Sequence, residues 1–296
     1  MATLAGDVPN NEGGKLFGLN HRRLTSALGV FAMGACAGAA ALALLFILAY
    51  VAFQGAHAIN WAFFTQLPRP VGEAGGGVAN GIMGSLIIVG LATLIATPIG
   101  VLTGTFLALF AWDAIGEPIR FLADVLSGIP SITIGLFAYT LWVAPFRHFS
   151  AGSASFAFAV LMLPLMIRTS EQAIRAVPRS IREGALALGL SVFTSTTRII
   201  LPAARPAIVT GLLLAVARIT GETAPLLFTA FGSQFWELNP KNPMAELSLQ
   251  VFTYAIAPYQ SWHEQAWGGA LILIVAVFSL NILARFAWSR KAWKPH

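Results

Sequence analysis

The sequence is poor in charged residues and has almost no cysteine. Only 10% of its 296 residues are charged, whereas 57% are hydrophobic. With a mean hydropathy of +0.74, the chain is too apolar for a soluble domain. We therefore expect an all-α membrane protein that is surrounded by membrane lipid. The single cysteine, Cys36, excludes an intrachain disulfide.

Signals for metal binding, nucleotide binding and catalysis are also missing. The five histidines are scattered near the ends of apolar stretches without the spacing of metal ligands, so we expect no metal site. No G-x4-G-K-S/T motif occurs, so this chain should not bind ATP through a phosphate loop. No nucleophile or carboxylate pair is placed for catalysis. We therefore predict a non-enzymatic chain with no catalytic residues and no cofactor of its own.

Apolar windows divide the chain into spans. A helix needs about 20 residues to cross the hydrocarbon core of a bilayer, and six windows are long enough: 27–53, 81–111, 119–144, 152–170, 206–232 and 265–288. They predict one six-helix domain over 27–290, with terminal tails at 1–26 and 291–296. An even number of spans places both termini on the same side.

Positive charge separates the two sides of the predicted bundle. The loops on one side carry only three basic residues: Arg69, Arg147 and Lys241. The termini and the 171–205 loop carry most of the others. Because basic loops stay in the cytoplasm, we expect both termini and this loop to be cytoplasmic. The net charge of +6 then reflects topology, and we expect no nucleic-acid partner.

A short helix is predicted within the 171–205 loop. Ser180 and Glu183 have the spacing of a capping box, and Gly189 is placed to end the helix in a left-handed C-cap. The helix should have about eight residues and a length of roughly 12 Å. Small residues on it would let another surface come close: Gly184, Ala185 and Ala187.

Glycine and proline interrupt three of the spans. Gly128 and Pro130 cannot both lie in an undisturbed helix, and unwound backbone at membrane depth is tolerated only where it is buried in protein or lines a cavity. Pro164 lies in the middle of the fourth span, and Pro225 lies in the fifth. These positions are either structural kinks or hinges beside a translocation path, and both interpretations remain open.

Ionisable residues lie inside the fifth span. Arg218 and Glu222 are four residues apart, which would place them on one helix face near mid-span, and Thr223 adds a hydroxyl. Such groups normally face a bundle interior or a wet cavity. They are either a structural ion pair or part of a substrate path. Arg168, at the end of the fourth span, is either a second path residue or an interfacial arginine.

The chemistry of these groups favours an oxyanion. A guanidinium fork binds a tetrahedral oxyanion through two parallel hydrogen bonds, and Ser131 beside the predicted helix break adds a further polar group. Glu222 can accept a hydrogen bond from an oxyanion that still carries a proton. Phosphate carries such a proton at neutral pH and sulfate does not, so we expect phosphate to be preferred.

The segment 233–264 between the last two spans should contain a surface helix. Asn242 and Pro243 have the form of an N-cap followed by a first-turn proline, and an amphipathic run follows them. This helix would lie outside the membrane. It could cover a pore or receive a soluble partner.

Several motifs together resemble a known family. Glu183-Gly184-Ala185, then Gly189 and then Ile199-x-Leu201-Pro202 resemble the docking loop of ABC importer membrane subunits, with glycine at 184 where the pattern has alanine. The segments 127–131, 163–169 and 217–230 closely resemble the A-type permease of the bacterial phosphate-specific ABC importer. The likeness covers about residues 80–290.

The resemblance implies a type I (MetI-like) importer permease fold with a cytoplasmic coupling helix that contacts an ATPase. It implies a multi-pass protein of the bacterial inner membrane that works by alternating access. Its partners would be a homologous C-type permease, an ATPase dimer that holds ATP and Mg²⁺, and an extracytoplasmic phosphate-binding protein. The family's phosphate-path arginines would fall on Arg168 and Arg218. The alternatives are a permease for sulfate, molybdate or another anion, and a secondary transporter or channel.

Overall fold

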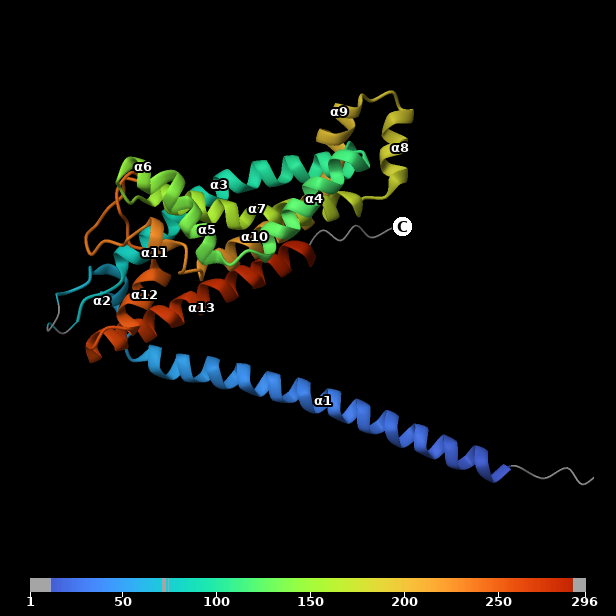
Figure 1. The fold of residues 1–296 in the computed structure, drawn as a ribbon, viewed down its shortest axis with the longest axis horizontal. Coiled ribbons are helices and arrows are strands. Elements are labelled where there is room, and N and C mark those ends of the chain that lie inside the picture. The colour runs from blue at the N-terminus through green and yellow to red at the C-terminus, as the bar shows by residue number, and fades with distance from the viewer. Residues whose placement is uncertain (1–11, 71–72, 74, 290–296) are drawn as a thin grey trace, which may run out of the picture. The chain divides into compact units, whose positions relative to one another are not determined.

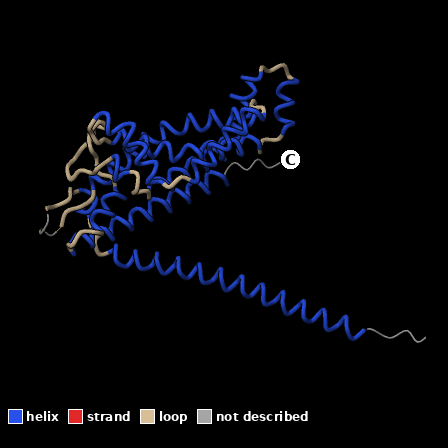
Figure 2. The backbone as a smooth tube through the Cα atoms, in the orientation of Figure 1, coloured by secondary structure: helices blue, strands red, loops and turns tan. Residues whose placement is uncertain are grey.

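The computed structural model describes residues 12–70, 73 and 75–289, and its described part is helical apart from loops and one isolated bridge between Phe231 and Met244 (Figure 2). The chain divides into two units, residues 1–53 and 54–296. Parts of both predicted tails, including 291–296, lie outside the described residues.

The first unit consists of most of helix α1 (Glu12–Ala56). This helix begins well before the predicted span at 27, and its apolar part is Thr25–Ala56, which contains an 18-residue window with a mean hydropathy of 2.4. At 1.5 Å per residue, 32 residues extend about 48 Å, which exceeds the thickness of a bilayer core. The helix continues unbroken because no proline lies between Glu12 and Gly55.

The second unit is a bundle centred on α7 (Ala151–Arg175), as Figure 1 shows. In the apolar window of α7, 61% of the residues are buried, against 28% in α3 (Ala79–Leu109) and 17% in α13 (Gln260–Ser289). Gly104 lets α3 approach α7 closely, because a β-carbon there would lie 2.6 Å from that of Ser170. Small residues at helix contacts replace the hydrophobic drive that lipid does not supply.

The third predicted span is broken. Helix α4 (Asp113–Gly128) and the segment that starts with α5 (Ser131–Ala138) meet at an angle of 103°. The helix restarts because Pro130 lacks an N–H and forces Ile129 into extended backbone, with φ −70° and ψ 132°. A π-helical turn and α6 (Ala144–Phe146) complete the segment. The described residues contain five candidate spans, or six if this pair is counted as one.

The fifth span lies earlier in the chain than the predicted 206–232. A continuous helix runs over Val192–Thr220, made of α9 (Val192–Ser195), a π-turn and α10 (Leu201–Thr220). Pro202 and Pro206 do not begin the helix, because the π-turn just before Pro202 accommodates the missing N–H. The helix ends at Gly221, and the short α11 (Leu226–Thr229) follows.

Short helices mark the two ends of the bundle, which we call the α8 end and the α12 end (Figure 1). Helix α8 (Arg179–Ala187) lies at one end. Helix α12 (Leu247–Ala255) lies at the other, near α2 (Trp61–Thr65). The predicted helix start at Asn242–Pro243 is wrong: α12 begins at Leu247, and Glu246 caps it. Four residues of α12 are buried, so it is not a free surface helix: Leu247, Ser248, Leu249 and Tyr254.

Candidate functional site

Arg218 lies in the last turn of α10, and its side chain is exposed. The prediction that Arg218 and Glu222 share one helix face near mid-span is wrong, because α10 ends at Thr220 and Glu222 lies in the turn that follows. Within the described residues the two side chains form no ion pair within 4.0 Å. Glu222 and Thr223 are half-buried. The guanidinium of Arg218 therefore has no carboxylate partner among the described residues.

The turn after α10 packs against the broken third span. A β-carbon on Gly135 of α5 would lie 2.6 Å from the Cα of Pro225, so glycine is required for this contact. Ser131 begins α5 and lies four residues before Gly135, on the same helix face. The breaks at Gly128–Pro130 and at Gly221–Pro225 therefore belong to neighbouring segments. Pro164, by contrast, lies inside α7, which continues through it without a break.

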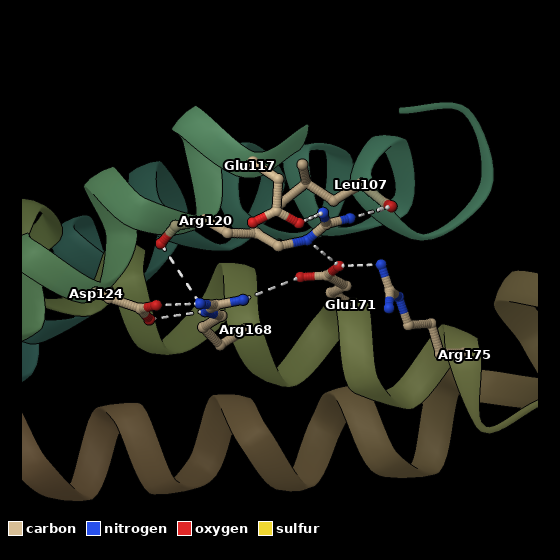
Figure 3. Close-up of polar contacts among 7 residues, drawn as sticks. All are labelled: Leu107, Glu117, Arg120, Asp124, Arg168, Glu171 and Arg175. Carbon is tan, nitrogen blue, oxygen red and sulfur yellow. Dashed lines mark hydrogen bonds and ion pairs between the residues drawn. The ribbon is translucent and has the colours of Figure 1, made fainter. Parts of the chain in front are cut away.

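Arg168 is held in a network of ion pairs between α4 and α7 (Figure 3). Its Nε donates to Asp124 Oδ1 at 2.9 Å, its Nη2 donates to Asp124 Oδ2, and its Nη1 lies 3.6 Å from Glu171 Oε2. The carboxylate of Asp124 thus occupies the guanidinium fork that an oxyanion would use. In this conformation Arg168 is not free to bind a second anion at that fork.

Glu171 organises this network, and the sequence analysis did not single it out. Its carboxylate is buried, with 3% of the residue exposed. Oε1 receives Arg120 Nε at 2.8 Å and Arg175 Nη2 at 2.7 Å. Arg120 also contacts Glu117 at 3.0 Å and donates to the Leu107 carbonyl at 3.1 Å. The spacing of Arg168, Glu171 and Arg175, at i−3 and i+4, is the signal that could have predicted this network.

The two arginines predicted for one path lie at different levels of the bundle. Helices α7 and α10 pack against each other, and Gly211 lies opposite Thr169, where a β-carbon would be 2.7 Å from that of the threonine. Arg168 is next to Thr169. Arg218 is seven residues beyond Gly211, about 10 Å further toward the α12 end. The two arginines are therefore offset along the bundle, with Arg168 nearer the α8 end.

Helix α8 differs from the predicted coupling helix in how it begins. It starts at Arg179 after Pro178, with no side-chain cap, so Ser180 and Glu183 form no capping box. Its end is as predicted: Gly189 has φ +80°, and the Leu190 N–H donates to the Ala185 carbonyl at 3.3 Å. The helix has nine residues.

The small residues of α8 do not share one outer face. Ala185 is buried within the chain, whereas Glu183, Gly184 and Ala187 are exposed. A β-carbon on Gly184 would meet no atom within 4 Å. The exposed Glu183, Gly184 and Ala187 are therefore available to another protein, whereas Ala185 is not. A cavity of about 710 Å³ lies beside α8 and includes Arg179, Arg182 and Glu183 in its lining.

A second buried carboxylate, Glu246, lies at the α12 end and was also missed as a site. It is fully buried and accepts hydrogen bonds from Ser85 Oγ at 2.9 Å and from the Leu249 N–H at 3.0 Å. Burial is the main cause that raises the pKa of its carboxyl, against the effect of these hydrogen bonds. Ser248 Oγ lies 2.6 Å from Glu246 Oε2 and 3.0 Å from the Glu222 carbonyl.

The described residues offer no place for a metal: no group of three or more His, Cys, Asp or Glu side chains has the geometry to hold one there. The candidate site instead contains Arg168 and Arg218 and the turn that carries the half-buried Glu222. The buried carboxylates of Glu171 and Glu246 lie at the two ends of the bundle.

Comparison with known proteins bears on this arrangement. Residues 96–290 match the family model described as binding-protein-dependent transport system inner membrane component. The chain is similar to the phosphate transport system permease protein PstA of Yersinia pestis, with 42% identity over 249 residues that cover 84% of each chain. It is 43% identical over 252 residues to PstA of Haemophilus influenzae, covering 83% of this chain and 89% of the relative.

A solved structure shares the fold. A chain from inward-facing conformations of the MetNI methionine ABC transporter aligns with a TM-score of 0.56 and 17% identity, covering 72% of this chain and 93% of that one. At this identity the likeness concerns the fold alone. It confirms the predicted all-α, MetI-like permease architecture.

Proposed function

This chain belongs to the family of binding-protein-dependent transport system inner membrane components and, within it, to the phosphate transport system permeases, and we propose that it carries inorganic phosphate into the cytoplasm as the permease subunit of an ATP-driven importer. The identity of 42% across 84% of both chains carries this proposal. Permeases for sulfate or molybdate, secondary transporters and channels are not favoured by these relatives.

The partners follow from the same premise. The chain works beside a homologous second permease, above an ATPase dimer that binds ATP and Mg²⁺, and below an extracytoplasmic phosphate-binding protein. The exposed Glu183 and Gly184 of α8 contact the ATPase. The buried Ala185 packs against the rest of this chain and Gly189 ends the helix, so both hold α8 in position. Both termini and α8 lie in the cytoplasm. This chain supplies the path and hydrolyses nothing itself.

Arg218 is the first contact for phosphate in the path. Its side chain is exposed and has no carboxylate partner among the described residues, which supports a role on a surface that the second permease covers. Glu222, Thr223 and Ser131 lie on the segments that pack together near it. Glu222 accepts a hydrogen bond from the protonated oxygen of phosphate and so distinguishes it from sulfate, which carries no proton.

Arg168 acts later, at the α8 end. Because Asp124 holds its guanidinium in this conformation, phosphate meets Arg168 only when α4 moves away from α7. The interrupted helices at Gly128–Pro130 and at Pro225 allow such a movement, since their backbone has already left helical geometry. Pro164 weakens α7 in the same region, because proline removes one helical hydrogen bond. ATP-driven movement of α8 would change this arrangement and complete the alternating-access cycle.

The test is phosphate uptake into proteoliposomes that hold the complete importer, with and without ATP. Arg218→Ala should abolish uptake without loss of assembly, and Arg218→Lys should be intermediate because it keeps the charge and loses the fork. Lys241→Ala removes an equal charge from an exposed loop and serves as the control. Uptake that needs no ATP would overturn the proposal, and so would full activity of Arg218→Ala.

A further inference from the structure

Glu246 is a buried carboxylate without a counter-ion. None of its surface is exposed. In the described part of the chain, no nitrogen of a lysine, arginine or histidine lies within 4.0 Å of its oxygens. An ionised carboxylate in such a place is strongly disfavoured, and the group normally takes up a proton instead. The phosphate path described above does not use this residue.

The hydroxyl of Ser248 indicates where that proton lies. A serine hydroxyl has one hydrogen to donate, yet Ser248 Oγ is close to two acceptors, Glu246 Oε2 at 2.6 Å and the Glu222 carbonyl at 3.0 Å. Both distances are those of O–H···O hydrogen bonds. Two hydrogens are therefore needed for these two contacts, and Ser248 supplies only one.

The second hydrogen comes from the carboxyl group. If Glu246 is a carboxylic acid, its O–H donates to Ser248 Oγ, and the Ser248 hydroxyl donates to the Glu222 carbonyl. Ser85 fits the same scheme, because its Oγ accepts the Leu247 N–H and donates to Glu246 Oε1, both at 2.9 Å. If Glu246 were ionised, the two contacts of Ser248 would have to share the single hydrogen of its hydroxyl.

We propose that Glu246 is held as a neutral carboxylic acid and that, through Ser248, it is a positioning residue for the turn that carries Glu222. The second half of this inference rests on the proposed function, since Glu222 matters for transport only if the turn lines the phosphate path. Helix α10 ends at Thr220, so the carbonyls that follow lack helical partners. Ser248 satisfies one of them and fixes the turn to α12.

The surroundings supply no charge that would ionise Glu246. Helix α3, which packs against α12, contains no ionisable side chain between residues 79 and 109. The titratable groups on the other neighbouring segments are Glu222 in the turn, Arg69 beside Pro68, Glu237 and Lys241 in the segment before Glu246, Tyr254 in α12, and His263 and Glu264 at the start of α13. None of the cations among them lies within 4.0 Å of Glu246. The N-terminus of α12 favours a negative charge, but the burial of the carboxyl is the larger effect. A pocket of about 250 Å³ borders Glu246, although none of the surface of Glu246 is exposed.

Infrared difference spectroscopy on the complete importer tests the protonation state. The spectrum of the wild type minus that of Glu246→Gln should contain the C=O stretch of a protonated carboxylic acid at neutral pH, and this band should disappear only at alkaline pH. A difference spectrum that shows only carboxylate bands at neutral pH would overturn the proposal.

Phosphate uptake as a function of pH tests the positioning role. Ser248→Ala removes the bond to the Glu222 carbonyl and should lower kcat/KM roughly 5- to 10-fold. Glu246→Gln should stay within about threefold of the wild type at neutral pH, because it is neutral and has a donor. The wild type should lose activity at alkaline pH relative to Glu246→Gln. Since both receive the same substrate, the titration of phosphate itself cancels.

The outcomes separate the two proposals. Ser248→Ala with wild-type uptake, or equal alkaline losses in the wild type and Glu246→Gln, would overturn the positioning role. If the wild-type complex carried no phosphate at all, the proposed function would fail by itself, and the infrared band would still decide whether Glu246 is neutral.

Discussion

The two buried glutamates lie at opposite ends of the bundle and are stabilised in different ways. Glu171, at the α8 end, is 3% exposed and contacts three arginines. Glu246, at the α12 end, is fully buried and contacts hydroxyls and a backbone N–H. One carboxylate is neutralised by cations, the other by a proton under our proposal. The same side chain therefore serves as a joint between helices in one place and as a hydrogen-bond donor in the other.

The elements that surround each residue explain the difference. Glu171 lies where α4 and α7 bring Arg120, Arg168 and Arg175 together (Figure 3). Glu246 lies against α3, whose 31 residues include no charged side chain. Breaking a buried ion pair leaves an unpaired charge, whereas removing a neutral group loses only its hydrogen bonds. Mutations at the two ends should therefore differ in size.

Glu171→Ala should have the largest effect. It leaves three arginines facing one another without their shared carboxylate, and the loss of one partner of a buried ion pair typically costs about 3–5 kcal/mol. We expect a large fall in the free energy of unfolding of the purified complex, measured by thermal unfolding in detergent. A melting temperature equal to that of the wild type would contradict the role of Glu171 as the joint between α4 and α7.

The sequence predicted the large features of the fold but not the details that distinguish its two ends. Long apolar stretches fix the existence of the spans, and Gly128 with Pro130 correctly indicated a break, because both effects are local. The fifth apolar window was placed at 206–232, whereas the helix runs over Val192–Thr220, with a π-turn inside it. The ends of a helix in lipid depend on tertiary contacts that local signals do not contain.

The candidate site was predicted in part for the same reason. Arg218 could be anticipated as a candidate functional residue because it interrupts an apolar stretch. The pairing of Arg168 with Asp124 joins residues 44 positions apart, and Ser85 meets Glu246 across 161 positions. No spacing in the sequence encodes these contacts. They follow from the packing of α4 on α7 and of α12 on α3.

Glu246→Ala should be the second largest change. It removes the N-cap of α12 and the bonds to Ser85 and Ser248, which together contribute about 2 kcal/mol. Because burial raises the pKa of Glu246, the folded state binds the proton more tightly. This contribution is complete below the pKa of the unfolded chain and is lost as the pH rises through the folded pKa. Thermal unfolding should therefore show a wild-type advantage that shrinks progressively as the pH rises above the pKa of the unfolded chain. An advantage that grows with pH would contradict a neutral Glu246.

Asp124→Asn should have a smaller effect on stability. The Asp124 side chain is 59% exposed, and exposed ion pairs contribute about 0.2–1 kcal/mol. Its consequence should be clearer in binding, because the substitution frees the fork of Arg168. We expect the complex to retain more labelled phosphate after a wash at low salt. Equal retention by Asp124→Asn and the wild type would mean that Asp124 does not compete for Arg168.

Glu117→Gln should have the smallest effect and calibrates the others. Glu117 contacts the same Arg120 as Glu171 does, at 3.0 Å against 2.8 Å, but its side chain is 70% exposed. Water and salt already screen this pair, so the loss should be within about 0.5 kcal/mol. Thermal unfolding should place Glu117→Gln beside the wild type and far from Glu171→Ala. If the two variants melted together, distance to Arg120 rather than burial would determine the strength of the joint, and the contrast between the two ends of the bundle would lose its physical basis.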